Sequence, residues 1–207
     1  MLTSIVRQSG TALRVLLVMT VVLGIVYPLG IWLVARVPGL SGPAEGSVIR
    51  AADGTAVGSS LIGIDPVAAD PAADPWFHTR PSATAEDELG LGPGDPSTSA
   101  GANLGGFDEG LSETIAARQE EIAAREGVDV SAVPMDAVSS SASGVDPGIS
   151  PAYAELQVPR VARVTGLPED AVRALVAEAA AGRALGFLGE PAVNVTELNL
   201  SVVAAQD

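Results

Sequence analysis

The sequence predicts an α+β protein, with a single N-terminal transmembrane helix followed by an extracytoplasmic α+β domain. Two observations support this class: a long uncharged segment near the N-terminus, and beyond it short strand patterns mixed with three capped helical patterns. From these patterns we expect a short cytoplasmic N-terminus over residues 1–14, the transmembrane helix over 15–35 and an acidic domain over 36–207. The stretch 65–102 of that domain, rich in Asp, Pro, Ala, Gly and Ser, predicts long loops.

The composition excludes several function classes. The 207 residues contain 11 basic residues, all arginine, against 25 acidic ones, for a net charge of −14. Without lysine the chain lacks the cation of a phosphate-binding Walker loop. Without cysteine, and with His78 as its one histidine, it lacks the usual ligands of a zinc site. Its negative charge also argues against nucleic-acid binding, which depends on neutralising phosphates.

The first element is the apolar helix. Val15 to Ala35 is free of charge, and at ~1.5 Å per residue it spans roughly 32 Å, which matches a bilayer core of about 30 Å. A cleaved signal peptide has a shorter apolar region, and a buried soluble helix rarely stays uncharged for so long. Pro28 lies within the span, where it predicts either a simple kink or a surface that packs against another membrane subunit.

Charge asymmetry predicts the orientation. Arg7 and Arg14 precede the span, so the positive-inside rule places the N-terminus in the cytoplasm. Residues 36–207 hold nine arginines and all 25 acids, a net charge of −16. An external domain without disulfides indicates a single-pass protein of the bacterial cell membrane.

The strands and loops follow. Ser47–Ile49 and Val57–Ile62 flank Asp53-Gly54, which predicts a hairpin. Five aromatic residues lie beyond the span, and we expect them to fill the core rather than form a ligand cage. They are Trp76, Phe77, Phe107, Tyr153 and Phe187.

Three helices are marked by their ends. An apolar stripe beginning at Leu111 predicts a helix that Gly127 stops. Ser150-Pro151 is a typical N-terminus, and that helix runs to Gly166. A third helix begins at Pro168 and is expected to end at Gly182.

The last element predicts a strand. Val193 and Val195 share one face, while Leu198, Leu200 and Val202 share the other. We therefore expect a strand that closes the sheet and either bulges near Thr196-Glu197 or is buried on both sides. Asn194 and Asn199 would then be polar groups beside the core. They either pin loops through hydrogen bonds or belong to a ligand site.

A search for catalytic residues gives little. Ser139 to Gly144, with Asp146 and His78, contains the residue types of a serine hydrolase, but the chain has no G-x-S-x-G motif. The same serine run would serve as an anion-binding loop or as a helix-capping loop. The acids Asp65, Asp70 and Asp74 offer oxygen ligands for calcium without an EF-hand spacing, which favours solvated loop acids.

Several short motifs occur in an order that is similar to one family. They are Tyr27-Pro28-Leu29, Leu61-Ile62-Gly63, Phe77-His78-Thr79-Arg80-Pro81, Asn103-Leu104-Gly105, Gly144-Val145-Asp146-Pro147, Gln157, Arg160-Val161-Ala162, Val193-Asn194-Val195 and Leu198-Asn199-Leu200. With them the chain resembles the C subunit of the Kdp-type potassium-transporting ATPase, a bacterial multi-subunit pump. It departs from that pattern at Ile64, Val145 and Gly148, so roles of those side chains do not carry over.

The resemblance implies a non-catalytic accessory subunit of an ATP-driven potassium importer, with no intrinsic cofactor and with ATP and K⁺ used by the whole complex. The implied partners are the P-type catalytic subunit, the channel-like potassium-binding subunit and a small membrane subunit. A role as a chaperone that raises the ATP affinity of the catalytic subunit is also implied, with Gln157 as the nucleotide contact. Partner or structural roles are implied for Tyr27, Pro28, Arg80, Asn103, Asp146, Arg160, Asn194 and Asn199.

The predicted topology conflicts with the nucleotide role. An external domain does not meet cytoplasmic ATP, and a charge of −16 repels a polyanion. An external domain would instead stabilise the assembly, or concentrate cations near a potassium entrance. The alternative is a membrane-anchored solute-binding or assembly module unrelated to a pump.

Overall fold

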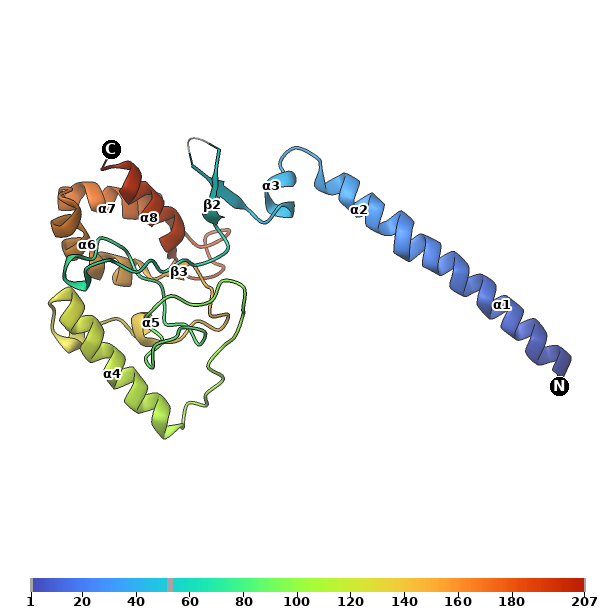
Figure 1. Ribbon diagram of the computed structural model, residues 1–207, viewed down its shortest axis with the longest axis horizontal. Coiled ribbons are helices and arrows are strands. Elements are labelled where there is room, and N and C mark those ends of the chain that lie inside the picture. Colours follow the sequence, from blue (N-terminus) through green and yellow to red (C-terminus); the bar gives the residue numbers. More distant parts are fainter. Residues whose placement is uncertain (1, 52–53, 207) are drawn as a thin grey trace. The chain divides into compact units, whose positions relative to one another are not determined.

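The computed structural model describes residues 2–51 and 54–206. By its internal contacts the chain divides between Ser47 and Val48 into two compact units (Figure 1). The N-terminal unit is mostly one helix. The C-terminal unit mixes helices with two small sheets, which confirms the predicted α+β class.

The N-terminal helix begins as α1 (Leu2–Val21), passes through a π-helical turn, η1 (Val22–Val26), and continues as α2 (Tyr27–Ala35). Its stretch Thr3–Ala35 contains an 18-residue window with a mean hydropathy of 2.3 and is long and apolar enough to cross a membrane. The π turn ends two residues before Pro28, which has no N–H and whose ring crowds the preceding turn. The proline therefore accounts for the irregular turn in the middle of the span.

A short polar stretch follows the apolar helix. The guanidinium of Arg36 lies 4.9 Å from the centre of the Trp32 ring and 3.1 Å from the carboxylate of Glu45. Helix α3 (Ser41–Ala44) completes the unit. The arginine and tryptophan occupy the end of the span where an aromatic belt is expected.

The C-terminal unit opens with the predicted hairpin. Strands β1 (Val48–Arg50) and β2 (Ala56–Ser59) pair antiparallel, with an irregular register between Ile49 and Arg50. Of the expected turn pair, Gly54 has a positive φ of 87°, which suits glycine. Asp53 lies outside the described residues.

The three predicted helices are confirmed, with one changed boundary. They are α4 (Glu109–Glu126), α6 (Pro151–Thr165) and α7 (Glu169–Glu178). The short elements η3 (Val130–Ala132) and α5 (Met135–Val138) lie between α4 and α6, and the turn η2 (Pro71–Ala73) lies in the loop before α4. The Ser150 hydroxyl accepts a hydrogen bond from the Tyr153 N–H, and Gly166 ends α6 in a left-handed conformation. Helix α7 ends at Glu178 rather than Gly182, because the chain turns there into a strand.

The expected C-terminal strand is wrong for most of its length. Only β5 (Ala192–Asn194) is extended, and it lies between β3 (Gly148–Ile149) and β4 (Ala180–Ala181), antiparallel to both. Helix α8 (Val195–Ala204) follows, capped by Asn194, whose side chain accepts a hydrogen bond from the Glu197 N–H. The buried Val195, Leu198 and Val202 follow helical spacing, so the same residues that mimic an alternating strand form a helix face.

The core lies where α6, α7, α8 and the short sheet meet α4 (Figure 1). Phe77 and Tyr153 are fully buried in it, as predicted. Phe107 and Phe187 are exposed, so the prediction that they fill the core is wrong. Each follows a glycine on a turn that carries its ring away from the helices.

Candidate functional site

The segment Phe77-His78 is held on both sides by side-chain amides. Asn199 of α8 accepts a hydrogen bond from the Phe77 N–H and donates one to the Phe77 carbonyl, both at 2.8 Å. Gln157 of α6 does the same for His78, at 2.8 and 3.3 Å. All four residues are buried. Two side chains thus supply the hydrogen bonds that neighbouring strands supply in a sheet.

The His78 ring lies between two carboxylates. Nδ1 is 2.7 Å from Asp65 Oδ1, and Nε2 is 2.6 Å from Asp74 Oδ2. Because an ionised carboxylate only accepts hydrogen bonds, both contacts are satisfied together when the ring is an imidazolium, which donates from both nitrogens. The prediction of solvated loop acids is therefore wrong for Asp65 and Asp74, which are buried beside the core.

Arg160 links this ring to α4. Its guanidinium donates to the carboxylate of Glu126 at 2.9 Å, to the carbonyls of Asp74 and Trp76 at 2.8 and 2.9 Å, and to Gln157 at 3.1 Å. The arginine is almost completely buried. We call Asp65, Asp74, His78, Glu126, Gln157 and Arg160 the His78 network.

The His78 network extends to a second arginine. Arg125 donates to Glu126 at 2.7 Å and to the phenol oxygen of Tyr153 at 2.9 Å. Burial alone would lower the pKa of Arg125, but the neighbouring Tyr153 and Glu126 outweigh it and raise the pKa. Burial in turn raises the pKa of the Tyr153 phenol, despite the adjacent arginine. Throughout the described residues, every buried side-chain nitrogen and oxygen has a hydrogen-bond partner.

Asp74 makes the stability of the His78 network depend on pH. Burial acts to raise the pKa of its carboxyl, but the hydrogen bond and charge of His78, the Trp76 N–H and the charge of Arg160 together lower it. A carboxyl with a lowered pKa in the folded state stabilises the fold above its unfolded pKa of about 3.9, and this contribution is lost as pH falls through the folded-state pKa.

Replacing this carboxyl tests the linkage. Asp74→Asn should lower the free energy of unfolding by about 1.5–3 kcal/mol at pH 7, since a charged hydrogen-bond acceptor is removed. The difference in free energy of unfolding between the variant and the parent should shrink as pH falls below about 4. Unfolding in urea is followed by the fluorescence of Trp76 in a Trp32→Phe background. Asp70→Asn, an exposed neighbour that caps η2, is the control. A difference that stays constant from pH 7 to pH 3 would contradict the assignment.

A second polar cluster joins the loops. Arg80 donates to the carbonyls of Ser139 and Ser140 and lies 3.4 Å from Asp146. Arg118 of α4 donates to the carbonyls of Leu89 and Val138. Burial lowers the pKa of the Arg118 guanidinium. These two arginines tie the loop 80–92 to the serine run.

Two glycines make the loop contacts possible. A Cβ on Gly63 would lie 2.6 Å from the Asp146 carbonyl, and one on Gly144 would lie 2.7 Å from the Ala100 carbonyl, closer than real side chains come. The Ser82 hydroxyl donates to the Gly144 carbonyl at 2.8 Å. Motif segments that are far apart in the sequence are therefore packed backbone to backbone.

The serine run does not form a hydrolase site with His78. Both ring nitrogens of His78 face carboxylates, and the Ser143 hydroxyl is hydrogen-bonded to that of Ser141. The Ser141 oxygen accepts from the Gly144 N–H at 3.0 Å, as a loop-capping side chain does. Among the residues that the structure describes, no three metal-ligating side chains gather at one point.

The acidic loop gives little support to the idea that its carboxylates concentrate cations near a potassium entrance. Within 65–95, Asp65 and Asp74 bind His78, and Asp70 caps η2. Burial would raise the pKa of Asp87, but three backbone N–H groups bind its carboxylate and lower it, and hydrogen bonds from Ser97 and Thr98 lower the pKa of Asp95. Most of these carboxylates thus hold loops in place.

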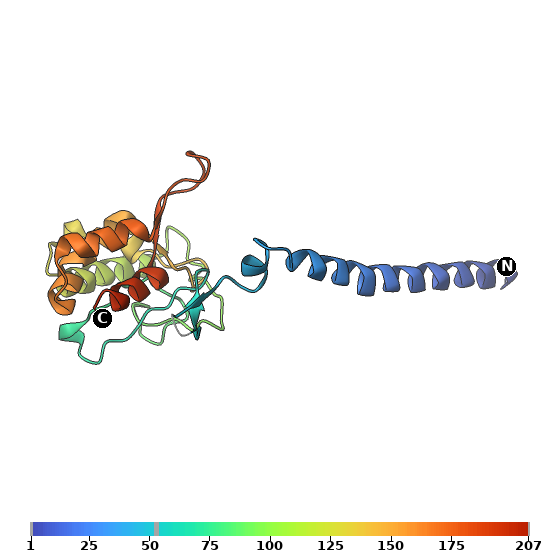
Figure 2. The ribbon, with the colours of Figure 1, turned by 90° about the horizontal axis from the view of Figure 1, so that it is seen from above.

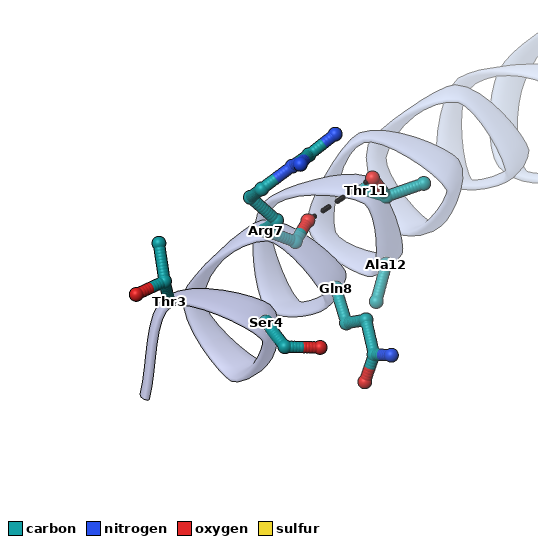
Figure 3. Close-up of a pocket in the computed structure, with 6 residues that line it drawn as sticks. All are labelled: Thr3, Ser4, Arg7, Gln8, Thr11 and Ala12. Carbon is teal, nitrogen blue, oxygen red and sulfur yellow. Dashed lines mark hydrogen bonds between the residues drawn. The ribbon is translucent and has the colours of Figure 1, made fainter. Parts of the chain in front are cut away.

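Two of the open hollows are poor ligand sites. The hollow beside His78 measures about 180 Å³, below the ~300 Å³ at which ligand pockets usually begin. Figure 3 shows another hollow on α1, where Arg7 and Thr11 project outward from one helix and share only the hydrogen bond from the Thr11 hydroxyl to the Arg7 carbonyl. One helix face cannot enclose a ligand.

The structure places the predicted site residues in separate groups. Asn199 and Gln157 bind Phe77-His78, Arg160 binds the carbonyl of the preceding Trp76, and Arg80 contacts Asp146. Asn194 caps α8 and also donates to the Ser60 carbonyl at 2.8 Å. Asn103, Tyr27 and Pro28 are exposed and belong to neither cluster.

Sequence reasoning did not predict that four of the charged residues are buried. They are Asp65, Asp74, Arg118 and Glu126. Glu126, for example, is the last residue of α4. No local pattern shows that α6 and the loop 65–78 lie against it.

Comparisons with known proteins agree along the whole chain. A family model described as "K+-transporting ATPase, c chain" matches residues 9–204. A potassium-transporting ATPase KdpC subunit of Kineococcus radiotolerans is 44% identical over 204 residues, covering 99% of this chain and 97% of the relative. Those of Sorangium cellulosum (44%, covering 94% and 96%) and Streptomyces coelicolor (43%, covering 98% and 94%) are similarly close. The chain therefore belongs to the K⁺-transporting ATPase C-chain family.

Proposed function

We propose that this protein is the single-pass accessory subunit of an ATP-driven potassium import complex and that it stabilises the assembly. Full-length similarity to potassium-transporting ATPase C subunits is the observation that carries the proposal. The chain has no lysine and so lacks the Asp-Lys-Thr-Gly-Thr motif of a P-type catalytic subunit. The proposed partners are that catalytic subunit, the channel-like potassium-binding subunit and the small membrane subunit.

The proposed topology places residues 1–14 in the cytoplasm, 15–35 in the membrane and 36–207 outside. The apolar helix and the arginines that precede it support this orientation. The acidic net charge of −16 beyond the span suits a soluble, external surface. In this arrangement the His78 network is a rigid internal frame, and the exposed surfaces of the C-terminal unit meet the partners.

A direct contact between Gln157 and ATP does not account for an effect of this subunit on the ATP affinity of the catalytic subunit. Gln157 is fully buried, and both its oxygen and its nitrogen are hydrogen-bonded to the Phe77-His78 segment or to Arg160. We propose that the subunit raises the ATP affinity of the catalytic subunit through contacts between subunits. Gln157 then acts as a positioning residue for the loop that it holds.

Affinity purification tests the proposed function. The tagged full-length chain, purified in mild detergent from potassium-starved cells, should recover a P-type ATPase and a large membrane subunit, with ATPase activity that K⁺ stimulates. Mass spectrometry identifies the partners, and the ATP concentration at half-maximal rate should rise when the accessory subunit is stripped away. Recovery of the chain alone, as a stable monomer, would refute the proposal.

A further inference from the structure

An ordered apolar arm extends from the small sheet. The arm, residues 182–190, joins β4 to β5 and projects from the rest of the C-terminal unit (Figure 2). Strand pairing of Ala181 with Ala192 closes its base. The Ala184 N–H donates to the Leu188 carbonyl at 2.8 Å, and Arg183 pairs with Glu190 at 2.6 Å. The arm is thus a folded hairpin with its charges at the base.

The tip of the arm exposes three large apolar side chains. Leu185 is 84%, Phe187 69% and Leu188 50% exposed. Leu185 also has a positive φ of 54°, a conformation that residues other than glycine rarely adopt. None of the three belongs to the hydrophobic core, so the folding of this unit does not explain them. Clustered exposed apolar groups on a soluble surface indicate an interaction site.

The charges favour a protein partner over lipid. Binding of an apolar segment to a bilayer surface is usually reinforced by attraction to anionic lipids. Here the tip has no basic residue, and the part of the chain beyond the span carries a net charge of −16. A phenylalanine between leucines resembles the aromatic anchors that dominate protein interfaces. A pocket with a neutral or basic rim complements the net negative charge of this part of the chain.

We propose that the arm inserts Leu185, Phe187 and Leu188 into an apolar pocket with a neutral or basic rim on the extracytoplasmic face of a membrane-embedded subunit. This inference rests on the proposed function, because it places the partner in the same ATPase complex. The paired Arg183 and Glu190 at the base meet the polar rim of that pocket. The arm then fixes the C-terminal unit over the partner.

Polar replacement of the tip tests the arm. The Leu185→Ser, Phe187→Ser double variant of the full chain should co-purify with about tenfold less partner, the loss expected on removing an interface anchor. Phe107→Ser is the control, since it removes an even more exposed phenylalanine that also follows a glycine, and it should retain the partner. Both variants should melt like the parent by Trp76 fluorescence. Undiminished recovery with the double variant would overturn the proposal.

Photo-crosslinking separates this inference from the proposed function. Benzoylphenylalanine in place of Phe187 should form an adduct with a membrane protein in intact cells, identified by mass spectrometry. An adduct with lipid alone, with a second copy of this chain, or with nothing would overturn the arm's assignment. If the adduct forms with a membrane protein that is not an ATPase subunit, the placement of the arm in the complex fails together with the proposed function.

Discussion

Arg160→Met is expected to remove a large part of the stability of the C-terminal unit. Methionine has a similar length but leaves Arg125 as the one arginine bound to Glu126, and it leaves the carbonyls of Asp74 and Trp76 unpaired. Breaking a buried ion pair by removing one partner costs about 3–5 kcal/mol, a large part of the ~5–15 kcal/mol that holds a domain together. Urea unfolding of the full chain in mild detergent, followed by Trp76 fluorescence with Trp32→Phe, measures the loss.

A second arginine provides the control. Arg173 pairs with Glu155, Glu169 and Asp170, but on an exposed surface. Its side-chain hydrogen bonds to Glu155 and Glu169 raise the pKa of the guanidinium, yet water screens these contacts. Arg173→Met should therefore change the free energy of unfolding far less than Arg160→Met. Equal losses from the two variants would show that burial of Arg160 is not what matters.

The helical part of the fold could be predicted because its signals are local. Ser150 and Gly166 mark the ends of α6, and each acts within a few residues of its own position. The last element was mispredicted because an alternating pattern and a helical pattern share the same residues. Asn194 and Glu197 carried the deciding signal, an N-cap residue and an acid three positions later.

The buried network could not be predicted because its contacts are distant in the sequence. Phe77 and Asn199 are 122 residues apart, and Glu126 and Arg160 are 34 apart. A carboxylate such as Asp65 has the same local pattern whether it is solvated or buried beside a histidine. Only the packing of α6 and α8 onto the loop decides whether such a carboxylate is solvated or buried, and no spacing rule predicts that packing.

Asn199→Asp is expected to make the stability of the C-terminal unit strongly dependent on pH. The new carboxylate would still accept a hydrogen bond from the Phe77 N–H, but it would face the Phe77 carbonyl without a proton to donate. A charge buried without a partner costs about 3–5 kcal/mol at pH 7. Once protonated, the carboxyl again donates to that carbonyl and restores the asparagine-like pairing.

The sign of the pH effect follows from linkage. Burial and the facing carbonyl raise the folded-state pKa of the new carboxyl above its unfolded value of about 3.9, so the folded state binds the proton more tightly. The free energy of unfolding should therefore rise by up to ~1.4 kcal/mol per unit as pH falls through that raised pKa. The recovery should stop near pH 4, where the contribution of Asp74 begins to be lost.

Asn103→Asp is the matched control for this variant. The Asn103 amide is exposed and donates only to the nearby Gly101 carbonyl, so water can solvate a carboxylate there. Its free energy of unfolding should follow the parent between pH 5 and pH 8, measured by the same Trp76 fluorescence. A flat profile for Asn199→Asp over that range would mean that the Phe77 pairing opens to water, and that the amides of α6 and α8 do not hold this segment rigidly.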